Sequence, residues 1–218
     1  MPGSVITISG IVGRWYARYR VGMSTDAAAG PLRAGGAAIA ALAIASSTMF
    51  MIPYSTQAII PEIGRGLAVG PAVTGLTITV VVIGIALGAW LMGPLSDRVG
   101  RRGVMVWSCA ALVLPTAAIA LVHDIGQLLV LRSLQGLLLP GLLTVATAYI
   151  YEAFPAHRVP TVVGFYTSGL VLGGFLGRTI PAALVEALGW RASLALLAVP
   201  VAASAVLDRK STRLNSSH

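Results

Sequence analysis

Residues 73–122 consist of two apolar runs joined by a short charged segment: VTGLTITVVVIGIALGAWL (73–91), MGPLSDRVGRRG (92–103) and VMVWSCAALVLPTAAIALV (104–122). Neither apolar run contains a charged residue. As a helix rising about 1.5 Å per residue, each run reaches about 28 Å, close to the roughly 30 Å hydrocarbon core of a bilayer. The stretch therefore predicts two membrane-spanning helices connected by a basic hairpin.

Charge-poor runs recur on both sides of this stretch, at residues 36–57, 125–151 and 161–185. A sixth run, residues 192–207, reaches only about 24 Å as a helix and is expected to be shortened. The 218 residues are 56% hydrophobic and 10% charged, which is too apolar for a soluble domain. The connections are too short to hold a separate domain. The sequence predicts an all-α membrane protein with six transmembrane helices in one unit, residues 34–207.

The two ends of the chain differ from this unit in composition. Residues 1–33 lack the apolar core and cleavage site of a signal peptide, so we expect a cytoplasmic leader. Within it, Met23-Ser-Thr-Asp resembles a translation start, which would make residues 1–22 upstream readthrough. Residues 208–218, DRKSTRLNSSH, resemble a translated sequencing adapter, and we expect an artefact. A short polar cytoplasmic tail is the alternative, although the short sixth run also favours truncation.

Basic residues lie mostly in the leader and in every second connection. Leaving out the tail, the leader and the segments after the second and fourth spans carry eight arginines, whereas the opposite segments carry only Arg65 and Arg191. Because Lys and Arg are enriched in cytoplasmic loops, we expect the N-terminus in the cytoplasm. The net charge of +8 is spread between spans rather than gathered on one face, which argues against a nucleic-acid partner.

The hairpin after the second span reads Gly93-Pro-Leu-Ser-Asp97-Arg98-Val-Gly100-Arg101-Arg102. Gly93 would allow a close helix approach, and Gly100 can take the positive φ that a tight reversal needs. A loop that only sets topology would also be basic, but an aspartate at this spacing among arginines is more specific. The segment resembles the G-x-L-x-D-R-x-G-R-R signature between helices two and three of the major facilitator superfamily.

This resemblance covers nearly all of residues 34–207. It implies a chain that forms the amino-terminal six-helix half of a twelve-helix transporter in the bacterial inner membrane, with the carboxyl-terminal half missing. It also implies a gating role for the hairpin, in which Asp97 meets the positive end of a helix in the other half and so holds one conformation.

The fourth span contains one arginine, in the segment Leu131-Arg132-Ser-Leu-Gln135-Gly136. The spacing i, i+3, i+4 places Arg132, Gln135 and Gly136 on one helical face. A charge inside a membrane normally faces a cavity or a partner, although Arg132 could instead extend to the nearby outer interface. The segment resembles the R-x-x-Q-G element on helix four of the family, which implies a role in proton coupling.

Gly169, Gly173 and Gly177 recur at four-residue intervals in the fifth span and leave one helix face nearly bare. Such faces are commonly packing surfaces for another helix. With Gly174 and Arg178, the run also resembles the antiporter element G-x-x-x-G-P-x-x-G-G-x-L. Here Gly174 replaces the proline and Arg178 the last glycine, so the kink that a proline gives is weakened. Arg178 is expected near the outer interface, where it could simply extend to water.

The first span ends in Pro53-Tyr54-Ser-Thr-Gln57, where the proline can bend the helix and Tyr54 and Gln57 share a face. The Met and aromatic residues of this segment suit apolar ligands as well as core packing. In the family, helices one and four line the central cavity. The resemblance therefore makes Tyr54, Gln57 and Thr147 candidates for substrate contact.

We interpret the chain as part of a proton-driven exporter of small organic or drug-like compounds. A proton-coupled uptake carrier for a sugar or another metabolite is the alternative. An intramembrane protease would need a nucleophile with a partnered base inside the membrane, but His123 and His157 fall in loops, so no enzyme activity is expected. The lone Cys109 gives no metal-site spacing, and no cofactor is expected. The expected partners are the substrate, protons, the lipid bilayer and the missing half.

Overall fold

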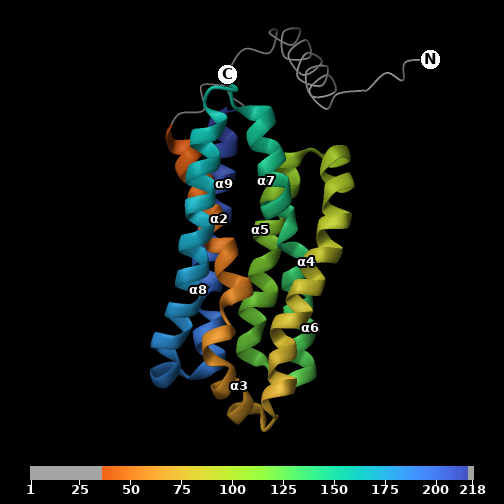
Figure 1. Ribbon diagram of the computed structural model, residues 1–218, viewed down its shortest axis with the longest axis vertical. Helices are drawn as coiled ribbons and strands as arrows, with labels where there is room; N and C mark the ends of the chain where they lie inside the picture. Colours follow the sequence, from red (N-terminus) through yellow and green to blue (C-terminus); the bar gives the residue numbers. More distant parts are fainter. Residues whose placement is uncertain (1–35, 216–218) are drawn as a thin grey trace, which may run out of the picture. The chain divides into compact units, whose positions relative to one another are not determined.

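The structure, a computed structural model, describes residues 36–215, and the predicted leader lies outside this range. Every regular element within it is a helix, which confirms the predicted all-α class. The helices stand side by side and run alternately in opposite directions (Figure 1). In this described range, five helical segments are long and apolar enough to cross a membrane, at residues 38–67, 71–99, 101–121, 125–153 and 159–195. They contain most of the five long runs predicted from the sequence.

The first span is broken rather than continuous. Helix α2 (Gly36–Tyr54) is followed by a 3₁₀ turn, η1 (Gln57–Ile59), and by the short helix α3 (Ile60–Leu67). The predicted span ended at Gln57, but α3 extends it, because Pro61 occupies a position at the start of a helix where no amide donor is needed.

The basic hairpin is mostly helical. Helix α4 (Pro71–Val99) continues through residues 93–99, and helix α5 (Arg101–Ala118) begins directly after Gly100, ending in the 3₁₀ turn η2 (Ile119–Leu121). Gly100 has φ 97°, which confirms the positive φ expected there. The reversal therefore takes place at one residue.

The fourth span consists of α6 (Ile125–Leu138) and α7 (Pro140–Ala153), because Pro140 lacks the amide that would continue the first helix. The fifth span lies in α8 (Val159–Ala195), which is interrupted at Gly189 with φ 74°. The sixth apolar run forms the end of α8 after Gly189 and the first part of α9 (Ala198–Asn215). It is helical, but the charged residues after Leu207 keep α9 outside the set of five apolar spans.

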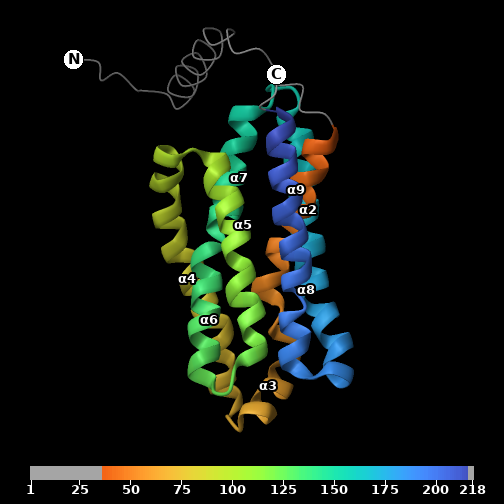
Figure 2. The ribbon, with the colours of Figure 1, turned by 180° about the vertical axis from the view of Figure 1, so that it is seen from behind.

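Helix α2 packs against α8, α4 against α6, and α5 against α7 and α9. In Figure 2, where the molecule is seen from behind, α9 lies beside α5 and α2. One apolar cluster includes Met49, Leu112, Leu142 and Val201, and a second lies around Ile63, Leu128 and Trp190 near α3. Because lipid tails are as apolar as these side chains, close packing and interhelical hydrogen bonds hold the helices together.

Candidate functional site

The end of α2 leaves main-chain acceptors inside the protein. The helix stops at Tyr54, with Pro53 in its last turn. Carbonyl groups in the last turn of a helix have no intrahelical amide partner, and the helix dipole makes this end negative. The Ile52 carbonyl accepts hydrogen bonds from the Ser55 amide at 3.3 Å and from Ser55 Oγ at 2.8 Å. Further donors are needed to satisfy the rest of this helix end.

Arg132 on α6 supplies those donors. Its Nη1 donates to the Ile52 carbonyl at 2.9 Å, and its Nη2 donates to the Pro53 carbonyl at 3.3 Å. Nη1 also donates to Ser55 Oγ at 3.2 Å, and Nη2 to Thr56 Oγ1 at 3.3 Å. The guanidinium thus caps the C-terminus of α2, where the helix dipole stabilises a cation.

The Arg132 side chain is fully buried, which excludes the alternative that it extends to the outer interface. Its Nε points at the Thr77 carbonyl on α4, at 3.4 Å. Within residues 36–215, the salt bridges join other residues, and no carboxylate pairs with Arg132. Carbonyl, hydroxyl and amide oxygens alone therefore compensate its charge. A charged group inside a membrane span without an acidic partner marks a candidate functional site.

Gln135 and Gly136 complete the segment that the sequence singled out. Arg132 Nη1 donates to Gln135 Oε1 at 2.9 Å, and Gln135 Nε2 donates to Thr116 Oγ1 on α5, also at 2.9 Å. A methyl group on Gly136 would run into the main chain of Val81 on α4. The segment thus links α6 to α2, α5 and α4 through one cap, one amide bridge and one close backbone contact.

The glycine face of α8 lies against α2. A methyl group on any of its three regularly spaced glycines would collide with a carbonyl of α2: Gly169 with Ala43, Gly173 with Ser47, and Gly177 with Met51. The structure confirms the packing role of this face. Gly174 differs, because a methyl group there would only touch the Phe50 and Tyr54 rings at 3.5–3.6 Å.

Arg178, Tyr54 and Gln57 come together at the same end of α2. Arg178 Nε on α8 donates to Gln57 Oε1 at 3.0 Å, and the guanidinium carbon lies 4.3 Å from the centre of the Tyr54 ring. Thr147 on α7 does not join them. It is exposed, and its Oγ1 donates a long hydrogen bond to the Leu143 carbonyl at 3.5 Å.

The hairpin contains an ion network. Arg101 Nε donates to Glu152 Oε2 on α7 at 2.7 Å, and Arg101 Nη2 lies 3.2 Å from Asp97 Oδ1. Arg98 is exposed and Arg102 is half-buried. Among residues 36–215, no helix closely approaches Gly93, because a methyl group there would meet nothing within 4 Å, and the expected close approach stays a prediction. The helix simply continues through this residue.

Sequence reasoning missed most partners of these residues. The Ser55 and Thr56 hydroxyls and the Thr77 carbonyl accept hydrogen bonds from Arg132, the Thr116 hydroxyl accepts one from Gln135, and Glu152 joins the hairpin network. Hydroxyl residues are common in membrane helices and give no pattern that marks one as a ligand of an arginine. Glu152 offered a weak signal, because it is an acid directly after the end of a predicted span.

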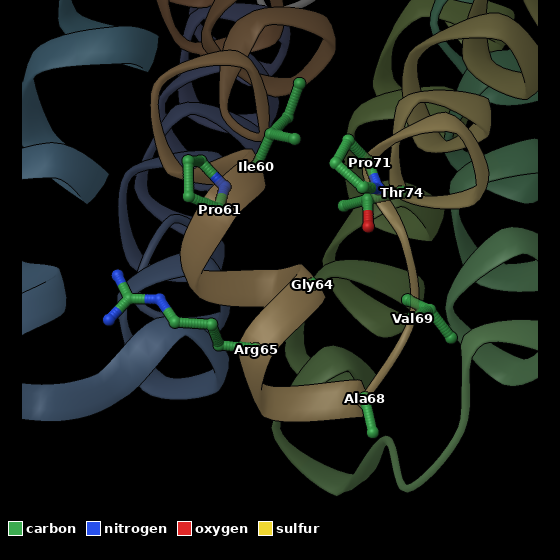
Figure 3. Close-up of a pocket in the computed structure, with 8 residues that line it drawn as sticks. All are labelled: Ile60, Pro61, Gly64, Arg65, Ala68, Val69, Pro71 and Thr74. Carbon is green, nitrogen blue, oxygen red and sulfur yellow. The ribbon is translucent and has the colours of Figure 1, made fainter.

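A cavity of about 510 Å³ lies between α3 and the start of α4 (Figure 3). Its lining is mostly apolar, and the Arg65 side chain extends away from Pro71 and Thr74 (Figure 3). Arg65 pairs with Glu62 at 2.9 Å rather than facing a second polar group across the cavity. The cavity lacks the converging polar groups that fix a ligand.

The profile of the Major Facilitator Superfamily matches residues 36–214. An uncharacterized transporter of Buchnera aphidicola is 33% identical over 148 residues, which cover 68% of this chain and 36% of that protein. The inner membrane transport protein YnfM of Escherichia coli is 30% identical over 167 residues, 77% of this chain and 40% of its own length. The multidrug resistance protein MdtM of Escherichia coli is 33% identical over 116 residues, 53% of this chain and 28% of its own length. The chain therefore spans well under half the length of these relatives.

Proposed function

The chain belongs to the Major Facilitator Superfamily, and from this premise we propose that it forms the amino-terminal half of a proton-driven exporter of small organic compounds. In this proposal residues 34–207 form the six-helix half, the N-terminus faces the cytoplasm, and a second half completes the substrate path. Transport would proceed by rocking of the two halves around a central site. A relative named as a multidrug resistance protein supports an efflux role.

The observation that carries the proposal is the buried, carboxylate-free Arg132. A guanidinium is charged at physiological pH and cannot itself carry the proton, so it would act through its field on an acid. A carboxylate that comes close to Arg132 would lose its proton more easily, and it would regain proton affinity when the helices separate. Proton affinity would thereby depend on conformation.

The acid that titrates is part of the proposal. Asp97 and Asp124 are both engaged elsewhere in this conformation: Asp97 pairs with Arg101, and Asp124 Oδ1 accepts the Gln127 amide at 3.0 Å as the N-cap of α6. The proton carrier would therefore be one of these two after a conformational change, or an acid of the second half. The cap on α2 supports a conformational role, because moving α6 relative to α2 would expose the carbonyls that Arg132 now satisfies.

Inside-out membrane vesicles that contain the transporter test the function. We expect an imposed pH gradient, acidic inside, to drive uptake of a lipophilic fluorescent dye into the vesicles. Collapse of the gradient with a protonophore should stop the uptake. Arg132→Ala should abolish gradient-driven transport while equilibrium binding of the dye persists.

Two results would contradict the proposal. If protons that enter right-side-out vesicles down a pH gradient carried the dye in with them, the protein would be the uptake carrier instead. Near-normal gradient-driven efflux by Arg132→Ala would reduce this residue to a structural cap of α2.

A further inference from the structure

Arg178 is a charged residue in an apolar helix, and it is exposed on the side of α8 next to α2. An arginine that only extends to the outer interface would point along the helix toward water. This one turns sideways onto α2, where Gln57 and the Tyr54 ring hold it. It forms no salt bridge within residues 36–215, and the acid of α8, Glu186, lies eight residues further along the helix.

The contacts leave one side of the guanidinium available. Gln57 Oε1 uses Nε, and the Tyr54 ring covers one face at 4.3 Å. No other hydrogen bond of Arg178 exists within the described residues, so the N–H groups of Nη1 and Nη2 have no acceptor there. A guanidinium presents these groups as a planar fork that matches the two oxygens of a carboxylate.

Aromatic side chains lie on the same part of α2 and α8 as Tyr54. The Phe50 and Tyr54 rings lie 5.1 Å apart, and the bare surface of Gly174 lies beneath them. Phe175, on the neighbouring position of α8, is exposed. An apolar, preferably aromatic, body could therefore stack beside the charge, while a cation would be repelled by an arginine that no acid neutralises.

We propose that Arg178, Tyr54 and Gln57 form an anion-binding subsite that selects amphipathic aromatic carboxylates as substrates. The inference rests on the proposed export function and names its substrate class. Arg178 is the specificity-determining residue. The Tyr54 ring fixes the plane of its guanidinium, and Gln57 Oε1 holds its Nε. The run departs from the antiporter element at Gly174 and Arg178; Arg178 is a member of the subsite, and Gly174 lies beside the Tyr54 ring.

Binding to the full chain in lipid nanodiscs tests the subsite without requiring transport. Three probes share one ring system: 2-naphthoate, its neutral amide 2-naphthamide, and the cation 2-naphthylmethylammonium. We expect naphthoate to bind more tightly than either of the others. Arg178→Gln should weaken naphthoate binding about tenfold or more, the loss expected for one charge-assisted bidentate pair, and should leave the amide within about twofold.

Two further variants serve as controls. Arg65→Gln removes another arginine, paired with Glu62 on α3, and should leave naphthoate binding unchanged. Arg178→Lys keeps the charge without the fork and should fall between wild type and Arg178→Gln. If Arg178→Gln does not fold, Arg178→Lys still tests the proposal, because it should narrow the preference for naphthoate over the amide.

Equal naphthoate affinity in wild type and in both Arg178 variants would overturn the subsite, as would tighter binding of the cation than of naphthoate. In the complete transporter, an acid of the second half could pair with Arg178 and occupy its free N–H groups. Naphthoate would then bind equally well to wild type and to both Arg178 variants, and the subsite would be refuted. Failure of the subsite differs from failure of the export function. A gradient-driven dye efflux that persists without naphthoate selectivity refutes only the subsite, and selective naphthoate binding without gradient-driven efflux refutes only proton-driven export.

Discussion

The guanidinium of Arg132 on α6 donates a 2.9 Å hydrogen bond to the main-chain carbonyl of Ile52, in the last turn of α2. The two residues are 80 positions apart in the chain. This bond joins a buried cation to the negative end of a helix. The helix dipole stabilises the charge of the guanidinium, and the guanidinium supplies a hydrogen-bond donor to a carbonyl at the helix end. The relationship also explains why a charge is tolerated there without a carboxylate.

Removing this cap should destabilise the protein. We expect Arg132→Ala to lower the free energy of unfolding by on the order of 3 kcal/mol, because the carbonyls of α2 and the Gln135 amide lose a charged partner. Arg132→Lys should recover part of it. Unfolding in a graded denaturant series measures the effect. Arg65→Ala, which breaks an exposed ion pair, should cost less than about 1 kcal/mol, and an equal loss in both variants would refute the cap.

Neighbouring glycines of α8 should respond differently to the same substitution. Gly173→Ala would place a methyl group against the Ser47 carbonyl, so α2 and α8 must separate and the protein should lose roughly 1–3 kcal/mol. The methyl group of Gly174→Ala would only touch two aromatic rings, so this variant should keep nearly the same free energy of unfolding. Thermal stability in one detergent compares the two variants. Equal stability would show that the contact between α2 and α8 is looser than described.

Asp97→Asn should slow transport without preventing folding. The Asp97 side chain is 64% exposed, and its ion pair with Arg101 contributes at most about 1 kcal/mol. If Asp97 also meets a helix end in another half, the variant should shift the equilibrium between conformations several-fold. Turnover and cysteine accessibility measure this shift. Glu152→Gln is the matched control, and an equal effect there would assign the role to Arg101 rather than to Asp97.

Cysteine labelling should report the orientation. Native Cys109 is fully buried and should react slowly with charged maleimides. In a Cys109→Ala background, His157→Cys should react from the cytoplasmic side and His123→Cys from the opposite side, because both histidines are exposed. Ser96 is unsuitable as a probe, since it is buried and bonds to the Gly93 carbonyl. Labelling of His157→Cys from outside would reverse the proposed topology.

The helical fold and its spans could be predicted from the sequence because hydrocarbon leaves few alternatives to a helix. An uncharged run must satisfy its own main-chain hydrogen bonds, so its length alone indicates a span. The glycine spacing on α8 likewise predicted a packing face, and the positive φ at Gly100 followed from the lack of a side chain. These properties are local, so a single segment contains the information needed to predict them.

The sequence by itself determined that the chain is an all-helical membrane protein, and it placed Arg132, Gln135 and Gly136 on one face of a helix. Only the tertiary structure decided what that face meets. The Arg132 side chain points into the protein, because α2 ends opposite it and its last carbonyls need donors. The Arg178 side chain instead lies over the Tyr54 ring at the surface of the bundle. Both arginines lie in apolar spans and look alike in the sequence. Their different environments depend on where a distant helix breaks, and contacts between segments so far apart leave no trace in the periodicity of either one.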